Sequence, residues 1–182
     1  MRAVCVYCGS SFGADPAYLE ATHELAVALA QRGIQVVYGG ASVGLMGALA
    51  DATLAAGGEV VGVIPQPLVD REIAHRGLTQ LHVVATMHER KALMAQLSDA
   101  FIALPGGIGT LEELIEVYTW AQLGLHDKPL AVLNTKGYYE PLAAFLDHAV
   151  EQGFLGAARR AALTVAADAE QLLGVWAVRT RT

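Results

Sequence analysis

The sequence is poor in features that define several classes of protein. None of its apolar runs approaches the roughly 18 residues that a membrane-spanning helix needs. Met1 and Arg2 lead directly into a short strand-like run, without the pattern of a targeting leader. Basic residues are scarce, and the net charge of −6 argues against a surface that binds nucleic-acid phosphates. We therefore expect a soluble, cytoplasmic protein with no membrane partner and no nucleic-acid polymer as a partner.

Cysteine is also rare. The only two, Cys5 and Cys8, form a C-x-x-C pair inside a short apolar run. Residues three apart in a strand face opposite sides of the sheet, which is unsuited to a redox or metal pair. The six histidines show no H-x-x-x-H or similar ligand spacing. The sequence thus predicts two structural cysteines and no metal site.

Apolar residues are abundant: 54% of the 182 residues are hydrophobic and 16% are charged, which is typical of one globular domain spanning residues 1–182. Strand-like and helix-like patterns alternate along it. The predicted strands are 3–8, 35–38, 60–64, 81–85, 100–104, 130–133 and 163–166. The predicted helices are 16–32, 48–56, 87–97, 110–123, 139–152 and 168–176, and residues 65–78 are irregular by pattern. Such alternation indicates an α/β protein, a three-layer Rossmann-like fold with a mostly parallel central sheet flanked by helices.

Glycine-rich turns follow two of these strands, at residues 39–47 and 106–109. The second joins an apolar strand to a helix within Leu104-Pro-Gly-Gly-Ile-Gly-Thr-Leu-Glu-Glu113. Glycines let backbone N–H groups point into one concavity, and the helix start adds its own unpaired N–H groups and the positive end of its dipole. We expect an anion at Gly107 to Thr110, beside the carboxylate of Glu113.

The same residues also fit a simpler interpretation. Thr110-x-x-Glu113 matches a capping box, in which Thr110 caps the helix and Glu113 reaches back to the N–H of the cap residue. Neither turn fits the dinucleotide-binding fingerprint, and no Gly-Lys-Ser/Thr of a P-loop occurs. A Rossmann-like fold without its usual cofactors is therefore expected.

Met87-His88-Glu89-Arg90-Lys91 is a dense group of charges that precedes the main glycine motif. Arg90 offers a planar fork of donors suited to phosphate or to a purine edge, and Lys91 offers a point charge. Taken alone, such a run of charges favours a solvated helix face.

Three motifs occur in order along the chain: Gly39-Gly40-x-x-x-Gly44-Leu45-Met46-Gly47, Met87-His88-x-Arg90-Lys91 and Pro105-Gly106-Gly107-x-Gly109-Thr110-x-x-Glu113. Together they resemble the LONELY GUY (LOG) family of cytokinin riboside 5′-monophosphate phosphoribohydrolases, over nearly the whole chain. The chain departs from the family pattern at Ala41, where a third glycine is common, and at Ile108, where tyrosine is common.

The resemblance implies hydrolysis of the N-glycosidic bond of a purine nucleoside 5′-monophosphate, which releases the free base and ribose 5-phosphate. It implies no metal or organic cofactor, and a homodimer. By motif matching, Arg90 and Glu113 fall on the family's catalytic pair. The matched substrate-binding positions are Glu72, Arg90, Lys91, Gly107, Ile108, Gly109, Thr110, Leu111, Glu112, Glu113 and Thr119.

The chemistry agrees with these roles. Cleaving the glycosidic bond builds positive charge on the ribose, which a carboxylate stabilises, and negative charge on the leaving base, which arginine stabilises. Two alternatives stay open: a nucleotide or cofactor carrier without turnover, and an enzyme that acts on AMP instead of a cytokinin precursor. The family's common label of lysine decarboxylase fits poorly, because none of the three lysines has a setting that suggests a pyridoxal phosphate Schiff base.

Overall fold

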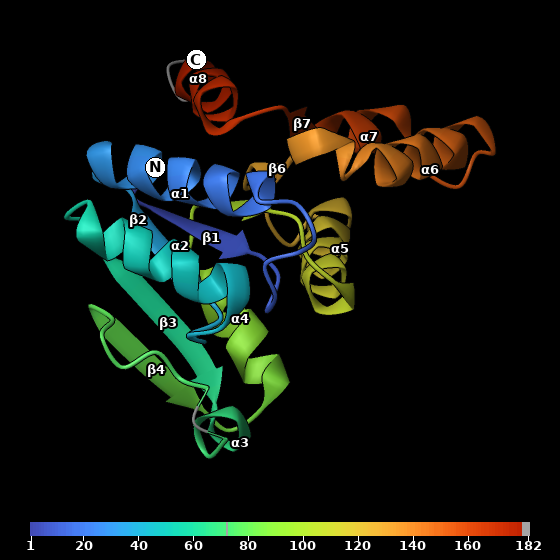
Figure 1. The fold of residues 1–182 in the computed structure, drawn as a ribbon. Coiled ribbons are helices and arrows are strands. Elements are labelled where there is room, and N and C mark those ends of the chain that lie inside the picture. Colours follow the sequence, from blue (N-terminus) through green and yellow to red (C-terminus); the bar gives the residue numbers. More distant parts are fainter. Residues whose placement is uncertain (72, 180–182) are drawn as a thin grey trace.

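Seven parallel strands form one sheet in the computed structural model, which describes residues 1–71 and 73–179 (Figure 1). Their order across the sheet is β4-β3-β2-β1-β5-β6-β7, and every neighbouring pair is parallel. The strands are β1 (Ala3–Tyr7), β2 (Gln35–Tyr38), β3 (Val60–Pro65), β4 (Gln80–Val84), β5 (Ala100–Ala103), β6 (Leu130–Leu133) and β7 (Leu163–Ala166). The predicted α/β class is confirmed.

Helices cover both faces of the sheet and complete three layers (Figure 1). They are α1 (Ala17–Gln31), α2 (Gly44–Ala55), α3 (Gln66–Val69), α4 (Met87–Leu97), α5 (Ile108–Gln122), α6 (Glu140–Glu151), α7 (Ala157–Ala162) and α8 (Ala169–Arg179), with a 3₁₀ turn at Thr135–Gly137. Side chains of α1, α2 and α8 fill the core on one face, and those of α4, α5 and α6 fill the core on the other.

Strand β1 lies near the middle of the sheet and is buried along its whole length. A central strand of a parallel sheet is covered on both faces, which explains its continuous apolar run. Cys5 belongs to the core on one face and Cys8 to the core on the other, and both thiols are free. The prediction that this C-x-x-C pair faces opposite sides of the sheet is therefore confirmed.

Several element boundaries differ from the predicted ones. Helix α2 begins at Gly44, inside the stretch predicted as a glycine turn, and α5 begins at Ile108 instead of Thr110. Two short helices, α3 and α7, lie in segments for which no helix is predicted. Helices of four and six residues carry too little periodicity for a pattern to reveal them.

The order of the strands places a topological switch point at β1. After β1 the chain adds β2, β3 and β4 on one side, and then crosses to add β5, β6 and β7 on the other. In open α/β sheets such a point leaves a crevice at the carboxyl ends of the strands, where ligands bind. The glycine-rich turns after β2 and β5 both lie at this edge.

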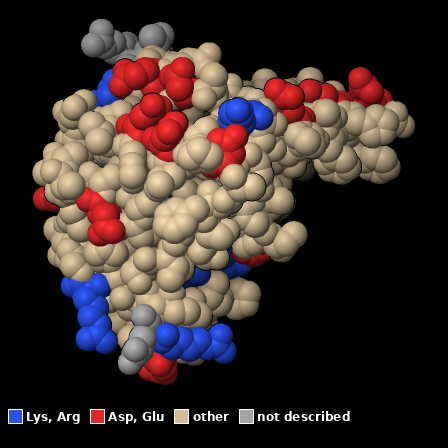
Figure 2. Space-filling view, viewed as in Figure 1, with Lys and Arg blue, Asp and Glu red and all other residues tan. Residues whose placement is uncertain are grey.

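Charge is unevenly distributed over the face shown in Figure 2. Acidic side chains gather at the end formed by α1 and α8, including Glu24, Asp168 and Glu170, and basic side chains lie mainly at the opposite end. Among the described residues, no helix combines the length and the apolar character needed to cross a membrane.

Candidate active site

A cavity of about 280 Å³ lies at the carboxyl ends of β1, β2 and β5, at the switch point of the sheet. Three strand-end loops and three helices, α2, α4 and α5, enclose it. Its lining residues are Val6, Tyr7, Cys8, Ser10, Gly39, Met46, Met87, Arg90, Gly107, Ile108, Gly109, Thr110, Glu112 and Glu113.

Close backbone contacts hold the three loops together. The Gly9 N–H donates to the Pro105 carbonyl at 3.2 Å, and the Gly9 carbonyl accepts from the Met46 N–H at 3.3 Å. Gly44 packs directly on the backbone of Ser10 and Ser11, so that a side chain there would overlap them. The loop after β1 is thus wedged between the two glycine-rich loops, which fixes the floor of the cavity.

The amino end of α5 presents backbone donors to the cavity. The first backbone hydrogen bond of α5 runs from the Leu111 N–H to the Gly107 carbonyl at 3.1 Å. The N–H groups of residues 108–110 therefore have no acceptor within the helix. A Cβ added at Gly107 or Gly109 would meet no atom within 4 Å, which leaves room for a ligand beside the backbone. Free amides and the positive helix end together favour an anion.

The alternative interpretation of Thr110 and Glu113 as a capping box is wrong. Gly107 caps α5 without any side-chain hydrogen bond, and Thr110 lies buried in the first turn against Gly106. The side-chain cap of this type belongs to α4: the Thr86 hydroxyl accepts from the Glu89 N–H at 3.1 Å, and the Glu89 carboxylate accepts from the Ala85 N–H at 3.0 Å. The carboxylate of Glu113 is therefore not used as a cap.

Arg90 is buried and fixed by strand ends. Its Nε donates to the Val63 carbonyl of β3 at 3.1 Å, and its Nη2 donates to the Gly39 carbonyl after β2 at 3.1 Å. A side chain at Gly39 would overlap the guanidinium group, so only glycine leaves room for it. The alternative interpretation of Arg90 and Lys91 as a solvated helix face is wrong, because both are buried.

Glu113 faces Arg90 across the cavity. Its Oε1 lies 3.9 Å from Arg90 Nη1, and only 13% of its side chain is exposed. Burial disfavours the charged carboxylate and raises the pKa of Glu113 to about 7, against the opposing effect of Arg90. A carboxyl group with this pKa can both hold and release a proton near neutral pH, as a general base requires.

Lys91 does not line the cavity itself but pairs with two carboxylates of α5, one of which, Glu112, does line it. Its ammonium donates to Glu112 and, at 3.0 Å, to Glu116. The hydrogen bond to Glu112 is the main cause that raises the pKa of Lys91, against its partial burial. The lysine is therefore firmly protonated and ties α4 to α5.

The structure brings together most of the predicted site residues. Arg90, Glu112, Glu113 and the residues 107–110 line the cavity. Lys91, Leu111 and Thr119 do not line it; the Thr119 hydroxyl donates to the Ile115 carbonyl one turn back along α5. Glu72 lies outside the described residues.

Sequence reasoning missed seven lining residues: Val6, Tyr7, Cys8, Ser10, Gly39, Met46 and Met87. Gly39, Met46 and Met87 belong to the quoted motifs, yet a role in the lining could not be read from them. The other four follow from the position of β1 at the switch point, which depends on strand order. A larger hollow of about 750 Å³ lies near α7 and the turn after α5, and contains no predicted site residue.

The chain is similar in sequence to known proteins. A family model described as "Possible lysine decarboxylase" matches residues 46–175. The chain is 51% identical over 172 residues to cytokinin riboside 5′-monophosphate phosphoribohydrolase LOG1 of Arabidopsis thaliana, covering 94% of this chain and 81% of that protein. It is 49% identical to the phosphoribohydrolase LOG of Oryza sativa subsp. japonica, covering 94% and 71%.

Solved structures show the same fold at lower identity. The molybdenum cofactor carrier protein of Chlamydomonas reinhardtii superposes with a TM-score of 0.73 at 20% identity, covering 100% of this chain and 99% of that one. At this identity the likeness concerns the fold alone.

Proposed function

Because the chain belongs to the LOG family, we propose that it hydrolyses the N-glycosidic bond of purine nucleoside 5′-monophosphates. The family model that matches the chain carries the description of possible lysine decarboxylases. The products are the free base and ribose 5-phosphate. Cytokinin riboside 5′-monophosphates, AMP or both serve as substrates. The observation that carries the proposal is the buried pair of Arg90 and Glu113 beside the free amides of α5.

The phosphate of the substrate binds the amides at Gly107 to Thr110, where the dipole of α5 adds its positive end. Glu113 lies on the second turn of the same helix. A carboxylate and a phosphate repel each other unless a spacer separates them, and the ribose of a nucleotide is such a spacer. We infer that the anomeric carbon of the bound nucleotide then lies near Glu113.

Glu113 then has two tasks in the reaction. Its carboxylate stabilises the positive charge that develops on the ribose as the glycosidic bond breaks, and it accepts a proton from the attacking water. The pKa of about 7 suits a base at neutral pH. Arg90, held by two backbone carbonyls, stabilises the negative charge that develops on the leaving base.

Decarboxylation through pyridoxal phosphate does not fit the lysines of this chain. A Schiff base needs a lysine whose neutral amine is accessible. Lys91 is bound by two carboxylates, Lys128 donates to the Ala95 carbonyl, and Lys136 pairs with Asp15. None of the three lysines is therefore a candidate for the Schiff base of that cofactor.

The assembly and location form part of the proposal. We infer a homodimer, which the exposed apolar side chains of α5 and α6 support. Phe145 is 65% exposed on α6, and Phe154, three residues beyond that helix, is 88% exposed. We also propose a cytoplasmic location, as expected from the sequence.

The proposed function is tested by incubating the purified protein with AMP, GMP, CMP, N6-isopentenyl AMP and adenosine, and separating the products by chromatography. We expect release of free base from the adenine-type monophosphates and at least a hundredfold lower kcat/KM with adenosine, because the phosphate anchors the substrate. Comparable rates with AMP and adenosine would remove the amides of α5 from the mechanism. Absence of free base from every nucleotide would favour a carrier without turnover.

A further inference from the structure

Two adjacent tyrosines contact the backbone behind the anion-binding turn. Tyr138 and Tyr139 lie between the 3₁₀ turn and α6, and no sequence motif discussed above includes them. The Tyr139 hydroxyl donates to the Leu104 carbonyl at 2.7 Å, and the Tyr138 hydroxyl donates to the Gly106 carbonyl. Both acceptors lie in the segment that leads from β5 into α5.

The bond from Tyr138 constrains one particular peptide group. The described backbone contains no cis peptide bond, so the carbonyl of Gly106 and the N–H of Gly107 point in opposite directions across one planar unit. A hydroxyl that holds the carbonyl on one side therefore directs the N–H to the other side. No side chain forms a hydrogen bond with the N–H group of Gly107 itself.

The two sides of this peptide face different hollows. Tyr138 and Gly106 line a small hollow of about 200 Å³, together with Phe12, Tyr18 and Leu45. Gly107 lines both this hollow and the 280 Å³ cavity that contains Arg90 and Glu113, whereas Gly106 and Tyr138 do not line the latter. With its carbonyl held on the Tyr138 side, the peptide turns its N–H toward the cavity.

Tyr138 is itself held in place. Its ring meets the edge of Tyr18 at 5.7 Å between centroids and that of Tyr139 at 5.1 Å. The turn before it is fixed as well: the Asn134 side chain accepts from the Tyr139 N–H at 2.8 Å, and Gly137 has a φ of 73°, a conformation that favours glycine. The hydroxyl therefore reaches Gly106 from a rigid support.

We propose that Tyr138 is a positioning residue for anion binding, whose hydroxyl orients the Gly106–Gly107 peptide so that the Gly107 N–H donates to the substrate phosphate. The inference rests on the proposed function, since it assigns the phosphate to that turn. Tyr139 supports the same segment one peptide earlier, through Leu104. Tyr138 touches no reacting atom, so its loss weakens phosphate binding and leaves the chemical step nearly intact.

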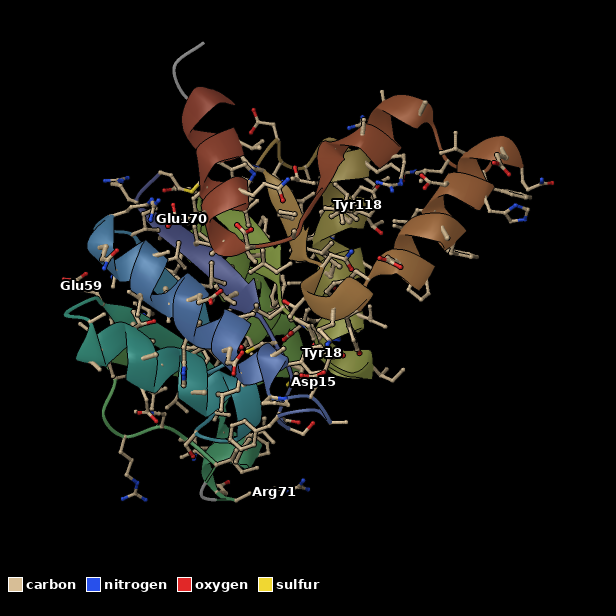
Figure 3. The ribbon with its side chains drawn as sticks, turned by 45° about the horizontal axis from the view of Figure 1, so that its top comes forward. Asp15, Tyr18, Glu59, Arg71, Tyr118 and Glu170 are labelled. Carbon is tan, nitrogen blue, oxygen red and sulfur yellow. The ribbon has the colours of Figure 1, made fainter. Side chains whose placement is uncertain are left out.

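The test compares Tyr138→Phe with Tyr118→Phe. The control removes an equivalent hydroxyl-to-carbonyl bond, from Tyr118 to the Arg159 carbonyl at 2.8 Å, near α7 and apart from Tyr18 and its neighbours (Figure 3). We measure kcat and KM for AMP, and the inhibition constants of inorganic phosphate and of adenine. Circular dichroism and thermal unfolding verify that both variants are folded.

In Tyr138→Phe, KM for AMP and the inhibition constant of phosphate both rise about tenfold, the scale of one lost charge-assisted hydrogen bond, while kcat and the inhibition by adenine change less than about twofold. Tyr118→Phe leaves all four values unchanged. Unaltered phosphate inhibition in Tyr138→Phe, or an equal loss of phosphate and adenine binding, overturns the inference while the proposed function stands. A wild-type protein that neither cleaves AMP nor binds phosphate overturns both.

Discussion

At the scale of single residues, the site depends on the contrast between a fixed cation and a carboxylate with a raised pKa. Arg90 has backbone acceptors for two of its nitrogens, while Glu113 makes no hydrogen bond to the described residues and keeps Arg90 as its neighbour at 3.9 Å. The cation is thus held rigidly, and the carboxylate stays available for a ligand. A buried carboxyl group with a raised pKa and a specific charge partner in a cleft is a candidate for a functional role.

Arg90→Ala and Glu113→Gln should each lower kcat/KM for AMP by about 10² or more, the scale expected when a transition-state charge or a general base is lost. Steady-state kinetics with the free base as the measured product tests this. Glu113 does not cap α5, so the glutamine variant should unfold in the same cooperative manner as the wild type. Full activity of Glu113→Gln would refute the catalytic role.

The pKa of Glu113 predicts how activity depends on pH. Burial raises this pKa to about 7, so the carboxyl group is largely protonated below that pH. A base must be ionised to accept a proton; kcat/KM should therefore rise tenfold per pH unit below about pH 7 and level off above it. A pH–rate profile measures this limb. A flat profile from pH 5 to pH 8 would assign the proton transfer to another group.

The same pKa should be visible in stability, independently of turnover. The folded protein holds the Glu113 proton more tightly than the unfolded chain, so ionisation lowers stability as pH rises from about 4.5 to about 7. Relative to Glu113→Gln, the wild type should lose about 3 kcal/mol of unfolding free energy between about pH 4 and about pH 8. Urea unfolding of both proteins at several pH values measures the difference.

At the scale of secondary-structure elements, the site is assembled where α4 crosses the ends of β2 and β3. Arg90 belongs to α4, yet its donors reach the carbonyls of Gly39 and Val63 at the ends of those strands. Its position therefore depends on the absence of a side chain at Gly39. The glycine-rich turn after β2 thus leaves room for the Arg90 side chain, whereas the glycine-rich turn after β5 offers N–H groups to an anion.

Gly39→Ala should displace the guanidinium group and lower kcat/KM toward the level of Arg90→Ala, since the added methyl group would occupy its position. Gly174→Ala in α8 is the matched control, because an added Cβ there meets no atom within 4 Å. Kinetics with AMP and thermal unfolding are measured for both variants. Wild-type activity in Gly39→Ala would indicate that Arg90 need not occupy this position.

Sequence patterns identified the long elements well and the short contacts poorly. The strands and the long helices follow from apolar runs and periodicity, because each buries one face or both in the core. The capping box, which the sequence offered as an alternative interpretation, illustrates this: Thr110-x-x-Glu113 and Thr86-x-x-Glu89 both match it, and only the second is used. Local spacing does not decide between them: in α5 the Thr110 side chain packs against Gly106, and Gly107 is the cap residue.

At the scale of the whole molecule, the order of the strands decides which residues meet. Alternation of strands and helices predicts a parallel sheet, but it does not reveal that β1 lies between β2 and β5. That order brings Ser10, Gly39 and Gly107 to one cavity although nearly a hundred positions separate the first from the last. The same order brings Cys8 into the lining of the cavity and the Tyr138 hydroxyl to the Gly106 carbonyl. No local motif indicates either contact.

The arrangement of α6 leads to the prediction about assembly. This helix extends from the body of the molecule beside α7 (Figure 1), and Leu146 is its only buried residue. Phe145 on this helix and Phe154 just beyond it are both exposed, and large apolar side chains that gather on one surface are typical of a protein interface. We expect a homodimer by size-exclusion chromatography with light scattering, and a shift to monomer in Phe145→Lys. Val27→Lys, which changes an exposed apolar side chain of α1 on the other face of the sheet, should remain dimeric. A monomeric wild type would refute the dimer, and a dimeric Phe145→Lys would place the interface on another surface of the molecule.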